Sequence, residues 1–157
     1  MNLRFIIPGK DKKDFISEGI KDYILKIKKY SKVSLEYVNE TTINNINEKE
    51  KKIALDKDAS NILKIISDKE YVILLDIHAK DISTSSLSNK INDIISSNGN
   101  ITFVIGSSYG VSDILRKRAN YSFSLSKLTF THYMSLLLTL EQVYRCFKIN
   151  NNEIYDK

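Results

Sequence analysis

Short apolar runs alternate with segments of helical periodicity along almost the whole chain, and this alternation constrains the fold more than any other feature. The strand-like runs are residues 3–7, 33–38, 71–77, 101–105 and a run that begins at Tyr121. The helical segments are residues 12–30, 48–67, 83–98, a short segment begun by Ser112, and 131–149. Strands that alternate with helices favour an α/β fold with a mostly parallel sheet covered by helices on both faces. A length of 157 residues suits one domain, residues 1–157, around a single core.

Two of the strand-like runs lead into loops rich in hydroxyl groups. The run 101–105 continues into Gly106-Ser-Ser-Tyr-Gly110, and the run from Tyr121 continues through a polar stretch to Phe130. Glycine lets a backbone approach a ligand closely, and the second loop offers consecutive backbone donors and acceptors. Ligands of open α/β sheets bind where strand ends meet, so we expect a ligand site there. Taken alone, the glycine loop matches neither the dinucleotide fingerprint nor the P-loop, and an ordinary strand-to-helix turn is favoured over a phosphate cradle.

The charge of the chain favours a polyanionic partner such as nucleic acid without proving one. Lysine and arginine total 24 against 19 acidic residues, which gives a net charge of +5. A lysine-rich solvated surface explains this charge equally well. A cluster at the end of the first helix complements the helix dipole more simply than it contacts phosphate, and it consists of Lys26, Lys28, Lys29 and Lys32.

Several classes of protein are disfavoured by what the sequence lacks. The single cysteine, Cys146, excludes an internal disulfide and a multi-cysteine zinc site, and its apolar helical context predicts a buried small hydrophobe. No metal-ligand motif or nucleophile elbow is visible, so we expect no metal and no covalent hydrolase chemistry. No apolar run reaches the length that spans a membrane, and a cytoplasmic location fits best.

The remaining polar candidates are isolated in the sequence. Asp76, near the end of a predicted strand, either meets a ribose or amino group of a ligand or caps a turn, and His78 is more often structural than catalytic in such a place. His132 either caps the last helix or belongs to a site. Arg145 follows it by thirteen positions, about 20 Å along a straight helix. The two side chains therefore serve one site only if different subunits supply them.

Four blocks together resemble the bacterial ribosomal RNA large subunit methyltransferase H family, and the similarity covers essentially the whole chain. The blocks are Phe103-Val-Ile-Gly-Ser-Ser-Tyr-Gly110, Leu125-Ser-Lys-Leu-Thr-Phe130 with His132, Leu140-Glu-Gln-Val-Tyr-Arg145 with Phe147-Lys-Ile149, and Glu153-Ile-Tyr155. The resemblance implies an α/β fold of the SPOUT class with a C-terminal trefoil knot, and a homodimer. It also implies methyl transfer from S-adenosylmethionine to N3 of a pseudouridine in helix 69 of 23S ribosomal RNA, the RNA partner within the ribosome.

The resemblance also implies the residues of the site. The cofactor-binding positions fall on Leu75, Gly106, Leu125, Ser126, Lys127, Leu128, Thr129 and Phe130. Methyl transfer needs alignment of donor and acceptor more than a catalytic triad, although N3 of the base must lose a proton. The groups expected around the target base, in part from the other subunit, are Tyr155, Asp156, Arg145 and His132.

The chain departs from the family pattern at four positions. Ser107 replaces a second glycine, Thr131 a proline, Leu136 an arginine and Asp156 a histidine. The last two changes affect RNA engagement and proton transfer more than cofactor binding. A knot-fold protein that binds RNA or the ribosome but methylates weakly or not at all is therefore the first alternative. The second is a small nucleotide-binding α/β domain that uses the Gly106 loop for phosphate.

Overall fold

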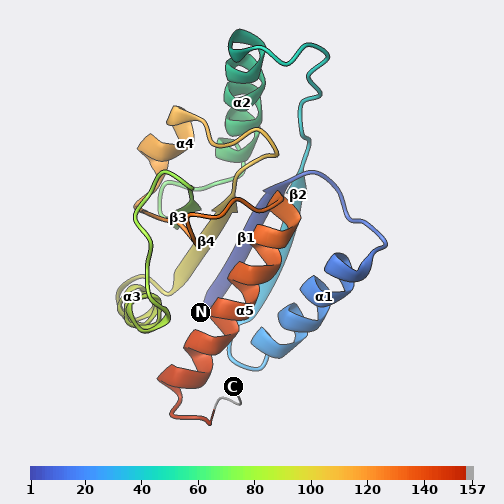
Figure 1. Ribbon diagram of the computed structural model, residues 1–157. Coiled ribbons are helices and arrows are strands. Elements are labelled where there is room, and N and C mark those ends of the chain that lie inside the picture. The colour runs from blue at the N-terminus through green and yellow to red at the C-terminus, as the bar shows by residue number, and fades with distance from the viewer. Residues whose placement is uncertain (155–157) are drawn as a thin grey trace.

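The computed structural model describes residues 1–154, and its five strands form one parallel sheet in the order β2-β1-β4-β3-β5 (Figure 1). The strands are β1 (Asn2–Pro8), β2 (Lys32–Val38), β3 (Tyr71–Leu75), β4 (Asn100–Ile105) and β5 (Tyr121–Phe123). The helices are α1 (Phe15–Ile27), α2 (Glu48–Leu63), α3 (Thr84–Ser97), α4 (Asp113–Arg118) and α5 (His132–Asn150). The predicted α/β class and the parallel sheet are confirmed.

Helices cover both faces of the sheet, because alternate strand side chains point to opposite sides. Leu3 and Phe5 of β1 pack into a core shared with α1, α3 and α5, whereas Ile6 packs into a second core with α2 and α4. Both cores are apolar, which explains why the strands read as continuous hydrophobic runs in the sequence. Figure 1 shows α5 lying across the first face between α1 and α3.

The position of α5 explains why its sequence is apolar on more than one side. Leu140 and Val143 are fully buried, and the helix packs against both α1 and α3 as well as against the sheet. Cys146 is fully buried in the same core, as predicted, and burial raises the pKa of its thiol to about 12. The thiol is therefore a packing group rather than a nucleophile.

A side-chain oxygen caps the start of every helix by accepting a backbone N–H from the first turn. The caps are Asp14, Asn47, Ser83, Ser112 and Thr131. Ser83 and Ser112 were expected from the sequence to start their helices, and they do. His132 was a candidate cap for α5, and that interpretation is wrong because the Thr131 hydroxyl accepts from Met134 N instead.

Three predicted boundaries were too long, and each has a local cause. The helix expected over 12–30 starts at Phe15, after the Asp14 cap, and ends at Ile27. The helix expected over 48–67 ends at Leu63, and its last residues form tighter turns in which Ile65 N donates to Ile62 O. The strand expected over 71–77 ends at Leu75 because the next residues turn away.

One predicted core position was also wrong. The helical spacing of apolar residues within 48–67 predicts that Ile53 lies on the buried face of α2, but its side chain is 58% exposed. The buried face of α2 instead carries Ala54, Asp58, Ala59 and Ile62. The buried carboxylate of Asp58 interrupts the apolar pattern, so the pattern alone does not identify the buried face of α2.

A charged cluster ties β1, β2 and the segment before β3 together at the amino ends of the strands. Arg4 donates to Glu36 at 2.7 and 2.8 Å and to both carboxylate oxygens of Glu70 at 3.2 Å. Glu70 also accepts from the Thr102 hydroxyl and from Ser67 N. These bonds to the charged forms hold the pKa of Glu36 below its usual range. They also lower the pKa of Glu70, although burial opposes that shift.

This cluster should make folding stability depend on pH in the acid range. A carboxylate whose pKa is lower in the folded state contributes stability above its unfolded pKa, about 4.3, and loses it as the pH falls through the folded pKa. We expect the urea midpoint of the wild-type protein to drop steeply below about pH 4.3. Glu70→Gln should be less stable at pH 7 and show a shallower drop. Glu48→Gln, at an exposed position, is the matched control, and an identical pH profile for all three proteins would contradict this role.

Candidate functional site

The carboxyl ends of the parallel strands bring four loops to one edge of the sheet. These loops follow β1, β3, β4 and β5, which are neighbours in the sheet order. The register confirms the alignment, because Leu75 lies opposite both Ile105 and Phe123. This is the edge at which the sequence predicted a ligand site.

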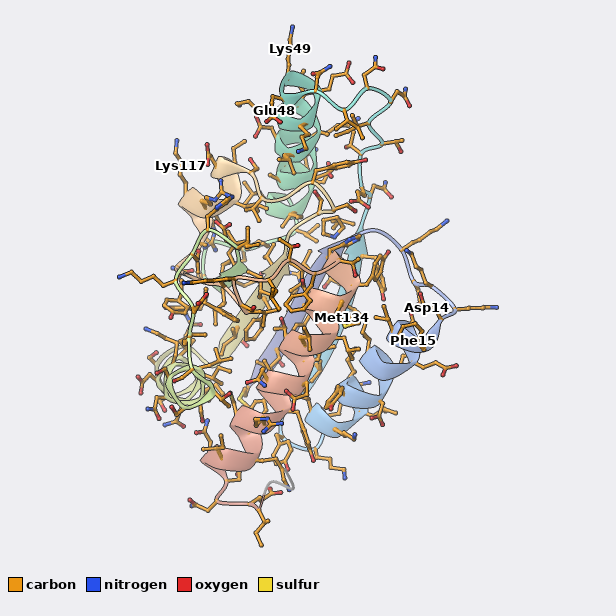
Figure 2. The ribbon with its side chains drawn as sticks, viewed as in Figure 1. Asp14, Phe15, Glu48, Lys49, Lys117 and Met134 are labelled. Atoms are coloured by element: carbon orange, nitrogen blue, oxygen red, sulfur yellow. The ribbon has the colours of Figure 1, made fainter. Side chains whose placement is uncertain are left out.

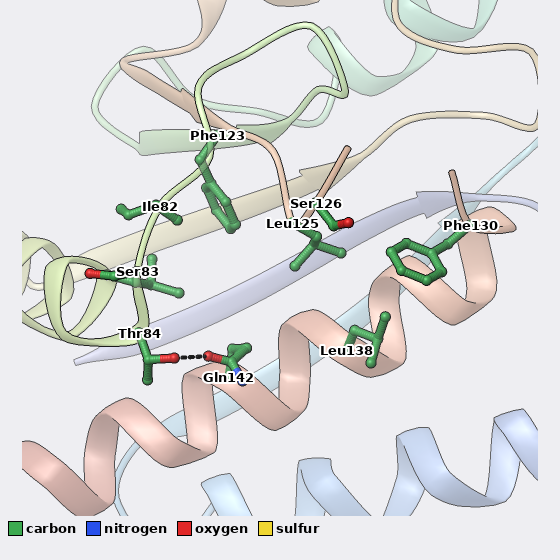
Figure 3. Close-up of a pocket in the computed structure, with 10 residues that line it drawn as sticks. Ile82, Ser83, Thr84, Phe123, Leu125, Ser126, Phe130, Leu138 and Gln142 are labelled. Atoms are coloured by element: carbon green, nitrogen blue, oxygen red, sulfur yellow. Dashed lines mark hydrogen bonds between the residues drawn. The ribbon is translucent and has the colours of Figure 1, made fainter. Parts of the chain in front are cut away.

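A pocket of about 270 Å³ opens at this edge, between the loop after β5, the loop after β3 and the outer face of α5. Figure 3 shows the apolar side chains of Phe123, Leu125, Phe130 and Leu138 pointing into the space between these segments. The volume is close to the lower limit of about 300 Å³ that is usual for small-molecule sites. The lining is Ile82, Ser83, Thr84, Leu87, Phe123, Leu125, Ser126, Phe130, Leu138 and Gln142.

The floor of the pocket carries a polar pair among apolar walls. The Thr84 hydroxyl donates to Gln142 Oε1 at 2.7 Å and so joins the start of α3 to the middle of α5 (Figure 3). Gln142 Nε2 in turn donates to Glu141 at 2.6 Å. Apolar walls with few convergent polar groups are typical of sites that bind a small organic ligand.

The hydroxyl-rich loop after β5 contributes only part of its length to the pocket. Leu125, Ser126 and Phe130 line it, whereas Lys127, Leu128 and Thr129 are exposed. Serines shape the loop: the Ser124 hydroxyl donates to Ser126 O at 2.7 Å, and Leu128 N donates to the Ser126 hydroxyl at 2.9 Å. The 70% exposure of Leu128 leaves an apolar side chain standing in solvent beside the pocket.

The glycine loop after β4 lies at the same edge but does not line this pocket. Gly106 is required by its own loop, since a Cβ there would lie 2.8 Å from Val111 Cγ2 and 2.9 Å from Gly110 O. Leu75 likewise sits in the core at the end of β3 rather than in the pocket wall. The sequence predicted one ligand site between the loops after β4 and β5. In the structure the pocket instead lies between the β5 loop, residues 82–84 and α5.

The backbone N–H groups of residues 107–110 already have partners within the protein, which argues against a phosphate cradle in this loop. Ser107 N and Gly110 N bond to each other's carbonyl oxygens, and Tyr109 N donates to the Ser107 hydroxyl. Ser108 N donates to Glu40, whose negative charge would also repel a phosphate. The nucleotide-binding alternative loses its structural basis here.

A Gly106→Ala substitution should disturb this loop measurably. Because the added methyl group would overlap Val111 and the Gly110 carbonyl, we expect a loss of about 1–3 kcal/mol in unfolding free energy. Denaturant titration measures this loss. In the double variant Gly106→Ala with Val111→Ala, one of the two clashes is removed, so part of the loss should be recovered. Equal stability of Gly106→Ala and wild type would contradict the close approach.

His132 stands beneath the glycine loop in a nearly closed polar cluster. Its side chain is 10% exposed, and Nδ1 lies 3.3 Å from the Ser108 hydroxyl, which donates to Glu40 at 2.8 Å. Since the hydroxyl proton is directed to Glu40, we assign the imidazole proton to Nδ1. Nε2 lies 3.8 Å from Glu40 and makes no hydrogen bond within residues 1–154. Burial lowers the pKa of His132, which keeps the ring neutral at pH 7.

Arg145 lies near the other end of α5 and forms an i,i+4 ion pair with Glu141 at 2.7 Å. The helix is continuous from His132 to Asn150, so one subunit does not bring Arg145 and His132 into one pocket. The other two residues expected around the target base, Tyr155 and Asp156, lie outside the described residues.

The remaining sequence candidates have structural partners. Asp76 is 6% exposed and binds Arg116 at 2.5 Å, and it also accepts from His78 N, so its carboxylate is engaged in a turn rather than aimed at the pocket. Thr131 caps α5, and Leu136 is fully buried in the core. A leucine in that position packs the core and contacts no polyanion.

Seven of the lining residues were not predicted from the sequence as site residues: Ile82, Ser83, Thr84, Leu87, Phe123, Leu138 and Gln142. The serines at the start of α3 were recognised as caps, which located that helix end but not its proximity to α5. No local sequence pattern predicts that the start of α3 lies next to α5. Within residues 1–154 no group of His, Cys, Asp and Glu side chains is arranged to hold a metal ion, and no helix is long and apolar enough to cross a membrane.

Comparison with known proteins finds one family model and full-length relatives that this chain resembles. A family described as "Predicted SPOUT methyltransferase" matches residues 1–156. The chain is 40% identical to the ribosomal RNA large subunit methyltransferase H of Clostridium botulinum (strain Alaska E43), with 100% of each chain covered. It is 38% identical to the protein of the same name from Dictyoglomus thermophilum, with 99% of each chain covered.

A solved structure shares the fold at low sequence identity. It is the ribosomal RNA small subunit methyltransferase E of Neisseria gonorrhoeae bound to S-adenosyl methionine, with a TM-score of 0.53 and 11% identity. The match covers 92% of this chain and 66% of that chain. At this identity the likeness concerns the fold alone.

Proposed function

The chain belongs to the SPOUT methyltransferase family, and from this premise we propose that it methylates ribosomal RNA with S-adenosylmethionine as methyl donor. The observation that carries the proposal is the full-length similarity to ribosomal RNA large subunit methyltransferase H proteins. We further propose that residues 1–157 act as one domain whose C-terminal part forms the trefoil knot of the family. It would act in the cytoplasm on 23S ribosomal RNA within the ribosome, with no metal.

The pocket suits the methyl donor in chemistry and nearly in size. Phe123, Leu125 and Phe130 offer apolar surface for a flat ring, and the Thr84 and Gln142 pair offers hydrogen bonds beside it. Bound there, the cofactor would supply a methyl group activated by a sulfonium. Ser126 and the exposed residues Lys127, Leu128 and Thr129 would close over it, and Leu75 and Gly106 would support it from the neighbouring strand ends.

We propose N3 of a pseudouridine in helix 69 as the methyl acceptor. An in-line displacement needs the acceptor held in line and water excluded, which a narrow pocket with apolar walls favours. The N3 proton must leave, and cationic or basic groups near the base would stabilise the charge that develops. We propose Arg145, Tyr155 and Asp156 for this task, with His132 holding the glycine loop from below because so little of its ring is exposed.

A homodimer is part of the proposal, as the family resemblance implies, because Arg145 and the glycine loop that His132 supports lie far apart in one subunit. Arg145 lies thirteen positions beyond His132 on one continuous helix, about 20 Å along its axis. If a partner subunit supplies its Arg145 and its tail to this pocket, the separation within each subunit no longer matters. Residues of α5 that are only partly buried, such as Met134 and Leu137, leave apolar surface for such a contact.

The alternative of an RNA-binding protein with weak or no methyltransferase activity rests on one observation. Leu136 is buried where the family pattern has arginine, so this chain lacks one cationic group that the family carries. Calorimetric titration with S-adenosylmethionine tests this alternative first, because no detectable cofactor binding would favour it.

The direct biochemical test uses purified protein, S-adenosylmethionine with a labelled methyl group, and ribosomes from cells that lack this gene. We expect label in 23S ribosomal RNA and none in 16S ribosomal RNA. Free 23S ribosomal RNA and isolated subunits, assayed in parallel, identify the assembly state that is the substrate. Cofactor binding without transfer to any of these RNAs would favour the alternative instead.

A further inference from the structure

Three lysines occupy the loop between β1 and α1, at the same edge of the sheet as the candidate site. Lys10, Lys12 and Lys13 are all exposed, and within residues 1–154 none of their amino groups forms an ion pair. The mechanism proposed above uses none of them. The six-residue loop from Gly9 to Asp14 therefore presents three amino groups that have no ion-pair partner among the described residues.

Neither of the two carboxylates of this loop forms an ion pair with these lysines. Asp11 lies 3.5 Å from Lys21 of α1, and the Asp14 side chain accepts from Ser17 N as the cap of α1. The cap bond is the main reason why the pKa of Asp14 lies below its usual value, and the charge of Lys12 contributes less. The loop is therefore basic, although lysines and aspartates are mixed along its sequence.

The loop is held against the start of α5 by a single tyrosine. The Tyr133 hydroxyl donates to Lys10 O at 2.8 Å and accepts from Lys10 N at 2.9 Å, and the Lys12 amino group lies 4.3 Å from the centre of its ring. Gly9 makes this contact possible, since its φ of +124° and a Cβ 2.2 Å from the tyrosine hydroxyl exclude other residues. The lysines therefore stand on an anchored loop rather than a free one.

The anchored loop adjoins the glycine loop. β1 and β4 are hydrogen-bonded neighbours, and Pro8 and Gly106 line the same small cavity. His132, next to Tyr133, lies close to both loops through Gly9 and Ser108. Figure 2 shows Asp14, the last residue of the loop, at the outer edge of the molecule, far from Lys49 at the distal end of α2 and from Lys117 on α4.

We propose that Lys10, Lys12 and Lys13 form a phosphate-contacting surface for the RNA substrate, positioned beside the site by Tyr133. This inference rests on the proposed function and names the part of the protein that meets the RNA backbone. Lysines recognise phosphate as point charges without reading sequence, and such contacts fix the orientation of a protein on RNA. The loop would thus orient the ribosomal RNA relative to the pocket.

The test compares two triple variants that remove the same charge from opposite ends of α1. The first is Lys10→Ala, Lys12→Ala, Lys13→Ala, and the matched control is Lys28→Ala, Lys29→Ala, Lys32→Ala, whose lysines are also exposed. The probe is a fluorescent hairpin RNA with the sequence of helix 69, titrated between 50 and 200 mM KCl. Steady-state methylation of ribosomes and calorimetric binding of S-adenosylmethionine are measured on the same proteins.

We expect the loop variant to bind the hairpin about tenfold more weakly at 50 mM KCl, with the slope of log Kd against log salt reduced by about two. Its KM for ribosomes should rise while kcat and cofactor affinity stay unchanged. Tyr133→Phe, which keeps all charges but removes both bonds to Lys10, should raise the same KM by about threefold. The control variant should resemble wild type.

Equal losses in the loop variant and the control would show a general effect of net charge and would overturn the inference. So would a loop variant with wild-type KM and salt slope. If the wild-type protein itself binds cofactor but methylates no ribosomal RNA, the proposed function fails first. An unchanged hairpin affinity in the loop variant would then still reject the basic surface independently.

Discussion

A Leu138→Trp substitution should abolish binding of S-adenosylmethionine while leaving the protein folded. Leu138 projects from α5 into the pocket, facing Leu125 and Phe130 across a space of only about 270 Å³ (Figure 3). An indole ring there would occupy much of that space. We expect the dissociation constant to rise at least about 100-fold, equivalent to roughly 2.7 kcal/mol, in calorimetric titration.

The chain contains no tryptophan, so the new side chain also reports on its own surroundings by fluorescence. Leu25→Trp, on the exposed side of α1, is the matched control and should bind the cofactor as wild type does. Circular dichroism and gel filtration check that both variants keep their fold and oligomeric state. Wild-type cofactor affinity in a folded Leu138→Trp protein would remove this pocket as the cofactor site.

An Arg145→Ala substitution should slow methyl transfer without weakening cofactor binding. Arg145 lies three positions beyond Gln142 of the pocket floor, and in the proposed dimer it acts at the partner's site. Loss of a group that stabilises developing charge lowers kcat by about 10²–10³. Its ion pair with Glu141 is a partly buried i,i+4 pair, so denaturant titration of the variant checks separately that the protein stays folded. Single-turnover methylation of ribosomes measures the rate.

Mixed dimers of these two variants test whether the site is shared between subunits. A dimer of one Leu138→Trp subunit and one Arg145→Ala subunit contains one intact site if the pocket and the arginine come from different chains. Co-expression with two affinity tags isolates that dimer, and we expect about half of the wild-type activity per dimer. If each subunit supplied both groups to its own site, the mixed dimer would be as inactive as either parent.

The fold was largely predictable because apolar periodicity acts locally. The apolar runs 3–7 and 101–105 predict strands. The helical segment 131–149 is apolar on more than one side, which is typical of a helix that packs on two neighbours, as α5 does. The errors arose where a single polar group decided the structure. Because Asp14 caps α1, the helix begins at Phe15 and not at residue 12. The buried face of α2 includes Asp58, so the apolar residues alone predicted the wrong face and Ile53 is exposed.

The edge of the sheet that carries the candidate site was predictable from the sequence, but most of the residues that line the pocket were not. Leu125, Ser126 and Phe130 came from the family resemblance, and they do line the pocket. Thr84 and Gln142 are 58 positions apart and meet only because α3 and α5 pack side by side. No pattern within either helix carries that information. The glycine loop that begins at Gly106 has a sequence typical of ligand binding, but most of its backbone N–H groups form hydrogen bonds within the protein.

The central claim is that this chain installs a methyl group on N3 of a pseudouridine in helix 69. The most direct test is mass spectrometry of nucleosides from the helix 69 fragment of 23S ribosomal RNA, isolated from cells with and without the gene. We predict N3-methylpseudouridine when the gene is present, its loss on deletion, and its return when the wild-type gene, but not the Leu138→Trp variant, is restored. An unchanged modification pattern after deletion would contradict the claim.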